Sequence, residues 1–192
     1  MNPGLYKFLV YTAIVMTVGW VGWGIYDSFF AARAPGDSAY HAANKLFEDE
    51  AYERALQSYD DALSDAPDPI HALRGKARTL MQLGRYDEAL ALFTEAISLE
   101  PDFAGTYANR GILYDRMGRH KLALRDYTTA IHLDPEVAEG PHWLIRFLRN
   151  QPEKPPGIAQ RAAYIAGELR KPESQRLLSV PEIDQQQRSY KK

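Results

Sequence analysis

Side chains that could carry chemistry are spread along the whole chain of 192 residues, and their spacing matches no catalytic pattern. The histidines are His41, His71, His120, His132 and His142. None has the second histidine four residues away and the carboxylate that a zinc-binding helix requires. Paired acids such as Asp60 and Asp61 lie side by side on one expected helix rather than across a cleft. We therefore expect no catalytic residues, no metal, no cofactor and no small-molecule substrate.

The composition narrows the classes of protein further. The chain contains no cysteine, which excludes disulfides, thiolate metal sites and thiol catalysis. Its formal net charge of −2 is too balanced to indicate nucleic-acid binding. Residues 37–68 hold nine acidic and two basic side chains, whereas residues 138–192 hold six acidic and ten basic ones. We interpret this asymmetry as solvated helix faces.

The strongest pattern is a segment that recurs at an interval of 34 residues, at 39–67, 73–101 and 107–135. Five positions agree among the copies: Ala43, Ala77 and Gly111; Ala55, Ala89 and Ala123; Ala62, Ala96 and Ala130; Tyr59, Phe93 and Tyr127; Pro67, Pro101 and Pro135. Small residues let two antiparallel helices approach closely, and an aromatic ring fills the space beside the contact. Proline ends the second helix. Each copy is therefore predicted to be a helical hairpin.

This spacing and these residues resemble the tetratricopeptide-repeat (TPR) family. The resemblance runs from Gly36 to Val137 and implies an all-α fold, an α-solenoid of three TPR hairpins at 36–69, 70–103 and 104–137. Gly84 and Gly118 take the turn between the two helices. Glu50 takes that position in the first copy, and Asp65 takes a normally apolar one, so we expect the first copy to be distorted.

Residues after the third copy are expected to close the stack. Residues 138–171 are predicted to be a partial fourth unit, a capping helix pair at about 139–149 and 158–170. The remaining residues, 172–192, are polar and broken by proline, and we expect an extended tail. Its apolar cluster of Leu177, Leu178 and Val180 either docks on the stack or is available to a partner.

Residues 8–26 contain no charged side chain, and 19 residues approach the ~20 that cross a bilayer as a helix. Aromatic residues crowd toward the ends of this stretch, as in an interfacial belt: Tyr11, Trp20, Trp23, Tyr26, Phe29 and Phe30. We expect a single transmembrane helix that contacts the membrane through residues 8–30, with residues 1–34 as anchor and linker. A cleaved signal peptide is the alternative, but Pro35 would directly follow its Ala32-Arg33-Ala34 cleavage pattern.

The anchor also predicts a location. Lys7 and the α-amine precede it, and an acidic repeat follows, which favours the N-terminus in the cytoplasm. We therefore expect a single-pass protein of the bacterial inner membrane with its TPR domain in the periplasm. The candidate helix-packing residues are Gly19, Gly22 and Gly24, because small residues let another transmembrane helix approach. Lipid-facing glycine is the open alternative.

The resemblance implies that the first helices line a concave face, and the TPR groove positions give the candidate binding residues. These are Tyr40, His41, Asn44, Phe47, His71, Arg74, Arg78, Met81, Asn109, Ile112, Arg116 and Arg146, with Asp115 and His142 on the same stripe. Arginine pairs with carboxylates, and amides bind an extended backbone, so this face suits a peptide. An empty polar surface, or a groove filled by the chain's own tail, are the alternatives.

Some TPR proteins hold the C-terminal carboxylate of chaperone tails through lysine and asparagine positions, and Arg74, Arg78 and Asn109 resemble part of that set. Glu139 and Trp143 stand where basic residues are expected, so the set is incomplete. Two functions remain. One is a membrane-anchored adaptor or assembly factor that binds an extended client segment. The other is an accessory structural subunit that contacts a larger membrane complex through its transmembrane helix and tail.

Overall fold

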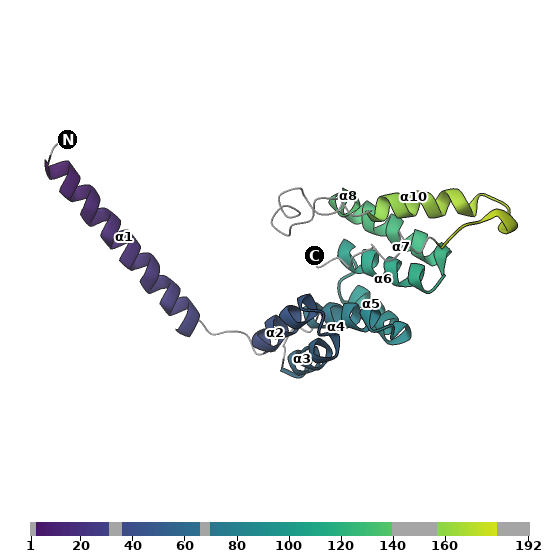
Figure 1. Ribbon diagram of the computed structural model, residues 1–192, viewed down its shortest axis with the longest axis horizontal. Coiled ribbons are helices and arrows are strands. Elements are labelled where there is room, and N and C mark those ends of the chain that lie inside the picture. Colours follow the sequence, from purple (N-terminus) through teal and green to yellow (C-terminus); the bar gives the residue numbers. More distant parts are fainter. Residues whose placement is uncertain (1–2, 31–35, 66–69, 140–156, 180–192) are drawn as a thin grey trace. The chain divides into compact units, whose positions relative to one another are not determined.

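The computed structural model describes residues 3–30, 36–65, 70–139 and 157–179 of the chain. All the regular structure in these ranges is helical (Figure 1), and the chain divides into two compact units, Met1–Ala34 and Pro35–Lys192. The predicted all-α class, with helical hairpins and one long apolar helix at the N-terminus, is confirmed.

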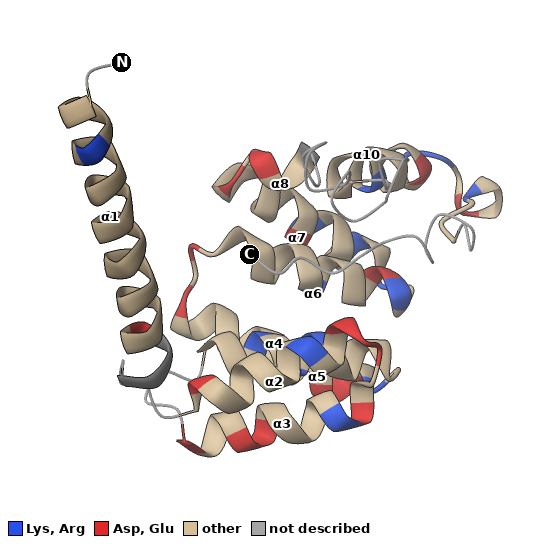
Figure 2. Cartoon of the chain, turned by 60° about the vertical axis from the view of Figure 1, so that its left-hand side comes forward, with Lys and Arg blue, Asp and Glu red and all other residues tan. Residues whose placement is uncertain are grey.

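The first unit is one helix, α1, from Pro3 to Phe30. Its stretch Pro3–Asp27 has a mean hydropathy of 1.7, and none of it is buried within the chain. Lys7 and Asp27 are its charged residues, one near each end (Figure 2). The length and composition of α1 fit both a membrane span and a signal sequence.

The second unit is a stack of three helical hairpins. Their helices are α2 (Asp37–Glu48), α3 (Tyr52–Asp65), α4 (Ile70–Gln82), α5 (Tyr86–Leu99), α6 (Ala104–Arg116) and α7 (His120–Leu133). The second helices begin at residues 52, 86 and 120 and end at 65, 99 and 133, so both boundaries recur every 34 residues. Each helix packs on the next, and the first helices also contact one another, α2 with α4 and α4 with α6. The first helices therefore form one continuous face of the stack.

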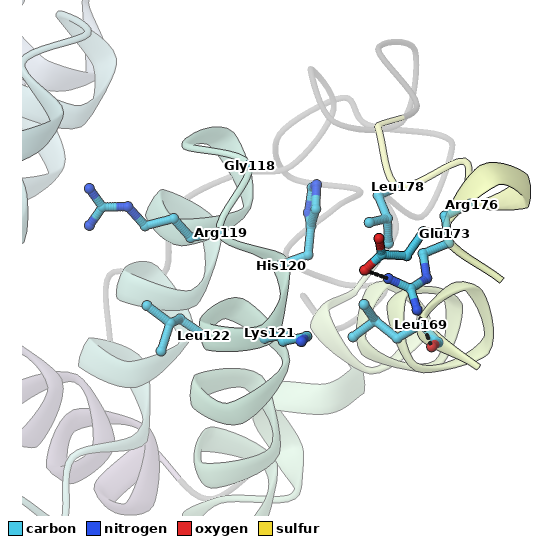
Figure 3. Close-up of a pocket in the computed structure, with 9 residues that line it drawn as sticks. All are labelled: Gly118, Arg119, His120, Lys121, Leu122, Leu169, Glu173, Arg176 and Leu178. Atoms are coloured by element: carbon cyan, nitrogen blue, oxygen red, sulfur yellow. Dashed lines mark hydrogen bonds and ion pairs between the residues drawn. The ribbon is translucent and has the colours of Figure 1, made fainter. Parts of the chain in front are cut away.

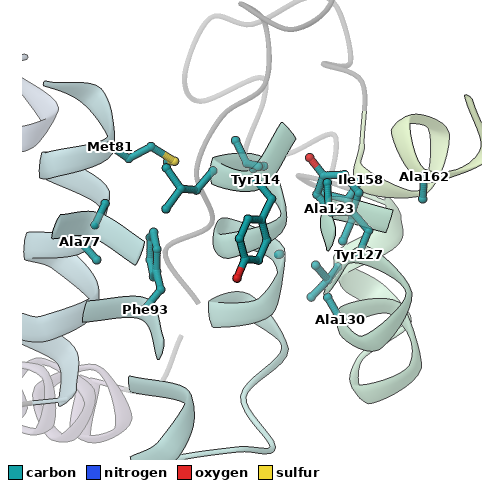
Figure 4. Close-up of a cluster of buried hydrophobic side chains, with 14 of the residues drawn as sticks. Ala77, Met81, Phe93, Tyr114, Ala123, Tyr127, Ala130, Ile158 and Ala162 are labelled. Atoms are coloured by element: carbon teal, nitrogen blue, oxygen red, sulfur yellow. The ribbon is translucent and has the colours of Figure 1, made fainter. Parts of the chain in front are cut away.

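The recurring small and aromatic residues of the three copies build the core. Tyr59, Phe93 and Tyr127 are fully buried, and so are the alanines that recur beside them. Figure 4 shows Phe93 and Met81 on one side of this core, and Tyr127 with residues of the following helices on the other. A Cβ atom on Gly111 would lie 2.6 Å from Cδ1 of Tyr127. The small residue is therefore a packing requirement, because the ring fills the space where a larger side chain would be.

The turns inside the hairpins share one backbone conformation. Gly84 and Gly118 have φ angles of 76° and 71°, and Glu50 has a φ of 59° at the equivalent position. In each turn the next N–H donates to a carbonyl five residues back, as Ala51 does to Leu46 at 2.9 Å. The first copy therefore makes the same turn as the others, and the expected distortion is wrong at this point.

The stack ends in α8 (Glu136–Glu139), α10 (Ile158–Leu169) and a 3₁₀ turn, η1 (Glu173–Gln175). The helix α10 begins at the predicted residue and packs on α7 and α8. It buries Ile158 and Ile165 in the core that spans the second and third hairpins. The rest of the helix predicted at 139–149, which includes Arg146, lies outside the described residues.

Candidate functional site

The candidate binding residues lie on the face formed by the first helices, which we call the inner face, and their exposure differs from helix to helix. The exposed residues are His41 and His71. The half-buried residues are Tyr40, Asn44, Phe47 and Arg116. The buried residues are Arg74, Arg78, Met81, Asn109 and Ile112. The α2 side is therefore the more accessible part of this face, and the deeper layer comes from α4 and α6.

An aromatic cluster marks the accessible end. The Tyr40 ring lies 5.6 Å from the His41 ring, 6.2 Å from the His71 ring and 6.2 Å from the Tyr59 ring, between ring centroids. Aromatic rings at these separations attract one another, and they offer a flat apolar surface with polar edges. Tyr40 thus joins α2 to α4 through His71.

Arg78 on α4 is the most unusual side chain of the inner face. It is 3% exposed, and its guanidinium carbon lies 5.1 Å from the centroid of the Phe47 ring. The guanidinium hydrogen-bonds the hydroxyl of Tyr59, which in turn donates to Oδ1 of Asn44 at 2.8 Å. Its Nη1 atom is buried and has no hydrogen-bond partner in the part of the chain that the structure describes.

Burial also shifts the pKa values of Tyr59 and Arg78. It raises the pKa of the Tyr59 hydroxyl to about 12, and it lowers the pKa of the Arg78 guanidinium because a charge is costly away from water. A buried cation with an open donor is unfavourable until an acceptor reaches it. The charge of Glu48 already acts on both groups, and an anionic acceptor that reached Nη1 would complete the hydrogen bonds of Arg78.

Arg74 and Arg116 have other contacts. Nε of Arg74 donates to Oγ1 of Thr106 at 2.8 Å, its Nη2 pairs with Glu100, and its guanidinium stacks 3.8 Å above the Phe103 ring. Arg74 thereby ties α4 to the beginning of α6. Nη1 of Arg116 donates to the side chain of Gln82 at 3.2 Å. Both arginines join adjacent hairpins across the inner face.

The apolar floor of the inner face is part of the core. Met81 and Ile112 are each 1% exposed and belong to the cluster drawn in Figure 4. Asn109, three residues before Ile112 on α6, is also buried. At 1% exposure, Met81 and Ile112 offer almost no surface to a ligand, so ligand contact on this face would come from the half-buried and exposed residues.

Asp115, on the same stripe of α6, is held in a buried ion pair with Arg161 of α10. Nε and Nη2 of Arg161 lie 2.6 and 2.9 Å from its two carboxylate oxygens. Nδ1 of His120 lies 3.0 Å from the same carboxylate, and the hydroxyl of Tyr127 lies 3.3 Å from it. Sequence reasoning missed Arg161, because α10 lies outside the 34-residue register and no repeat position pointed to it.

A second buried pair was also missed. Nε and Nη2 of Arg110 lie 2.6 and 3.1 Å from the carboxylate of Asp126, so α6 and α7 are joined inside the third hairpin. The equivalent positions of the second copy hold Lys76 and Leu92. Because the pair occurs in one copy alone, the repeat gave no signal for it.

In the described ranges there is no group of three or more His, Asp or Glu side chains placed to bind a metal ion. In α1, a Cβ atom built on Gly19, Gly22 or Gly24 would meet nothing within 4 Å. These three positions therefore lie open on the helix surface.

Comparison with known proteins agrees with the hairpin architecture. Two family models described as tetratricopeptide repeat match the chain, one at residues 46–109 and one at residues 104–137. A search of the curated protein sequences gives no match.

Three solved structures are similar in fold. The TPR2B domain of yeast Sti1 is 21% identical, with a TM-score of 0.54 over 70% of this chain and 98% of that one. The first TPR of Spaghetti (RPAP3) is 18% identical, with a TM-score of 0.52 over 70% and 98%. The Sgt2 TPR domain of Aspergillus fumigatus is 20% identical, with a TM-score of 0.52 over 71% and 85%. Because both family models and the hairpin geometry agree, the chain is a TPR repeat protein.

Proposed function

We propose that this chain is a membrane-anchored TPR adaptor or assembly factor that binds an extended peptide segment of a client protein along its inner face. The observation that carries the proposal is Arg78. Its buried cation has an open Nη1 donor. A carboxylate is the acceptor that best matches a guanidinium, through paired charge-assisted hydrogen bonds. A client segment with an acidic side chain or a free C-terminal carboxylate would provide it.

The surroundings of Arg78 support an extended peptide as the ligand. Half-buried Asn44 and Tyr40 stand at the accessible edge, and an amide can hydrogen-bond a peptide backbone. Phe47 adds an apolar contact next to the charge. Arg74 is engaged with Thr106 and Glu100, so in this proposal it braces α4 and leaves ligand contact to Arg78.

Two of the similar structures were solved with a bound partner, and one of these partners is an acidic peptide. The first TPR of Spaghetti is bound to the HSP90 peptide SRMEEVD, and the TPR2B domain of Sti1 is in a complex with pHsp70. Glu139 and Trp143 of this chain replace the basic residues expected of a chaperone-tail site. We therefore propose a client with an acidic extended segment rather than a chaperone tail.

Photo-crosslinking tests the inner face in the intact protein. A benzophenone amino acid replaces exposed His41, the full chain is expressed in membranes, and captured segments are identified by mass spectrometry. Arg78→Met should reduce capture by about tenfold, the effect of one charge-assisted hydrogen bond. Arg54→Met, on the exposed face of α3, is the matched control and should leave capture unchanged. Undiminished capture by a folded Arg78→Met chain would refute the proposed site.

The anchor is part of the proposal. The uncharged stretch of α1 and Lys7 before it support a single-pass inner-membrane protein with the TPR domain in the periplasm. In the sequence, residues 31–36 separate α1 from α2.

A second candidate function, an accessory subunit of a membrane complex, is favoured by the open surface at Gly19, Gly22 and Gly24. A neighbouring transmembrane helix could approach closely there. In that case Gly22→Leu would abolish stoichiometric co-purification with the complex, whereas Arg78→Met would leave it intact. The opposite result selects the adaptor.

A further inference from the structure

The segment Glu173–Ser179, which we call the strap, lies against α10 and is held mainly through its backbone. The N–H of Leu177 donates to Oε2 of Glu168 at 2.8 Å, and the hydroxyl of Tyr164 donates to the carbonyl of Leu177 at 2.6 Å. Nη2 of Arg161 donates to the carbonyl of Leu178 at 2.9 Å. Arg176, which begins this part of the strap, has the extended dihedrals φ −78° and ψ 129°.

The three side chains that hold the strap belong to one face of one helix. Arg161, Tyr164 and Glu168 are spaced i, i+3 and i+7, so they follow one another along α10. Seven helical residues rise about 10 Å, which is about the length of three extended residues. On this face Glu168 and Tyr164 hold the N–H and the carbonyl of Leu177, and Arg161 holds the carbonyl of Leu178. Because these groups bind backbone atoms, they accept many sequences.

The side chains of the strap contribute unequally. Leu178 packs against the main core, whereas the neighbouring Leu177 is 69% exposed. Beside Leu178 lies an open pocket of about 280 Å³ (Figure 3). Its lining residues are Gly118, Arg119, His120, Lys121, Leu122, Leu169, Glu173, Arg176 and Leu178. Three of these residues, Glu173, Arg176 and Leu178, belong to the strap, so the strap and the helices α7 and α10 enclose an unfilled space between them.

The pocket is lined by both apolar and charged residues. Leu122 and Leu169 lie on the two helices that border it, α7 and α10 (Figure 3). Lys121 extends toward Leu169, whereas the guanidinium of Arg119 is directed away from the strap (Figure 3). Glu173 of the strap pairs with Arg176 at 3.3 Å. A larger apolar side chain in place of Leu178, with an acidic neighbour, would fill this space and bring a carboxylate toward Lys121.

We propose that the face of α10 formed by Arg161, Tyr164 and Glu168, with the pocket beside it, is a second peptide-binding site. The strap occupies this site in cis. Its partner is an extended segment of another protein that carries a large apolar residue next to an acidic one. Because the strap is covalently attached, its high effective concentration excludes weak competitors and admits segments that fill the pocket better. This site is separate from the inner face and does not depend on Arg78.

A synthetic peptide of residues 172–179 tests the site on the full-length chain in detergent. Leu178→Asp places a charge in the apolar contact and should release the strap. The labelled peptide should then bind this variant about tenfold more tightly than it binds the unaltered chain, because the competitor in cis is gone. Leu177→Asp changes an exposed neighbour and is the matched control, with no gain in binding. Equal affinity for Leu178→Asp and the unaltered chain would overturn the proposal.

Two further measurements test the proposal without relying on the Leu178→Asp variant alone. Adding Tyr164→Phe and Glu168→Gln to the Leu178→Asp chain should weaken peptide binding about tenfold, and retained binding would overturn the assignment. In the unaltered chain, excess peptide with phenylalanine in place of Leu178 should speed hydrogen exchange at the amide of Leu177 by displacing the strap. Unchanged exchange at saturating peptide would show that the strap is a fixed part of the fold.

Discussion

Glu50 is a residue whose side chain does not suit its backbone. Its φ of 59° falls in the left-handed region, which glycine occupies at the equivalent Gly84 and Gly118. A side chain with a Cβ atom costs roughly 1–2 kcal/mol in that region, because the Cβ crowds the following carbonyl. The first hairpin therefore keeps the shared turn at an energetic cost that the other two hairpins avoid.

Glu50→Gly should raise the free energy of unfolding by about 1 kcal/mol, since it removes this strain. Urea denaturation followed by circular dichroism measures the change. Gly84→Ala is the control and should lower stability by a similar amount, because a Cβ there would meet nothing within 4 Å and alters only the backbone preference. A loss of stability in Glu50→Gly would mean that the Glu50 side chain contributes more than the strain costs.

For single residues, the sequence predicted which helix face each side chain lies on but not how deeply it is buried. The repeat register placed Arg74, Arg78 and Met81 on the first helix of the second copy, but it could not show their depth. Met81 joins the core, and Arg74 joins α4 to the start of α6. The burial of Arg78 depends on contacts with Tyr59 and Phe47 of another hairpin, and its Nη1 atom is left without a partner among the described residues. No local sequence pattern encodes such long-range contacts.

At the scale of helices, the Asp115–Arg161 pair fastens α10 to the third hairpin. Both side chains are almost fully buried, so their charges are poorly screened and each depends on the other. The pair also links α10, which has no place in the repeat and packs on α7 and α8, to Asp115 of α6.

Arg161→Met should therefore destabilise the chain by about 3 kcal/mol, because it leaves the carboxylate of Asp115 buried without its main partner. The double variant Asp115→Leu with Arg161→Met should lose less than the sum of the single variants, since no unpaired charge remains. A double-mutant cycle by urea denaturation measures this coupling. Additive losses would mean that His120 and Tyr127 satisfy Asp115 without Arg161.

Element boundaries were predictable where the repeat or a local sequence pattern controls them. The start of α10 at Ile158 and the hairpin helices follow from local patterns of apolar residues, glycine and proline. The docking of the strap was left open between two alternatives. Leu178 packs and Leu177 is exposed, a distinction that depends on Glu168 and Tyr164 of another element. Val180 lies outside the described residues.

The contact between the strap and α10 should depend on pH through Glu168. The hydrogen bond from the Leu177 amide, together with Lys171, lowers the pKa of the Glu168 carboxyl below its usual value of 4.5. A group whose pKa is depressed on folding stabilises the fold above its unfolded-state pKa and loses that contribution as the pH falls through the folded-state pKa. The strap should therefore be fully held above pH 4.5 and loosen below it.

The amide resonance of Leu177 reports this transition in an NMR titration of the solubilised chain. It should move toward its unbound position as the pH falls below 4.5, with the direction set by protonation of Glu168. Glu168→Gln should abolish the pH dependence. A Leu177 resonance that titrates equally in Glu168→Gln would assign the transition to a different group.

At the scale of the whole molecule, the two units differ in where their apolar side chains lie. The large apolar side chains of α1 are exposed, with Trp20 at 80% and Trp23 at 70%. The second unit buries its apolar residues in its own core. Such an exposed apolar surface indicates a role in contact with lipid or protein. The sequence predicted this division from charge and hydropathy, but neither can separate an anchor from a signal sequence.

The absence of cysteine makes this question directly testable, because one introduced cysteine is a unique label. In bacterial spheroplasts, a membrane-impermeant maleimide should label Gln57→Cys on the exposed face of α3, and it should label Asn2→Cys only after permeabilisation. This result follows from an anchor with Lys7 on the cytoplasmic side. The purified chain should also keep its full mass of 21.7 kDa. A mass reduced by the N-terminal segment would assign α1 as a signal sequence, and the reversed labelling would place the repeats in the cytoplasm.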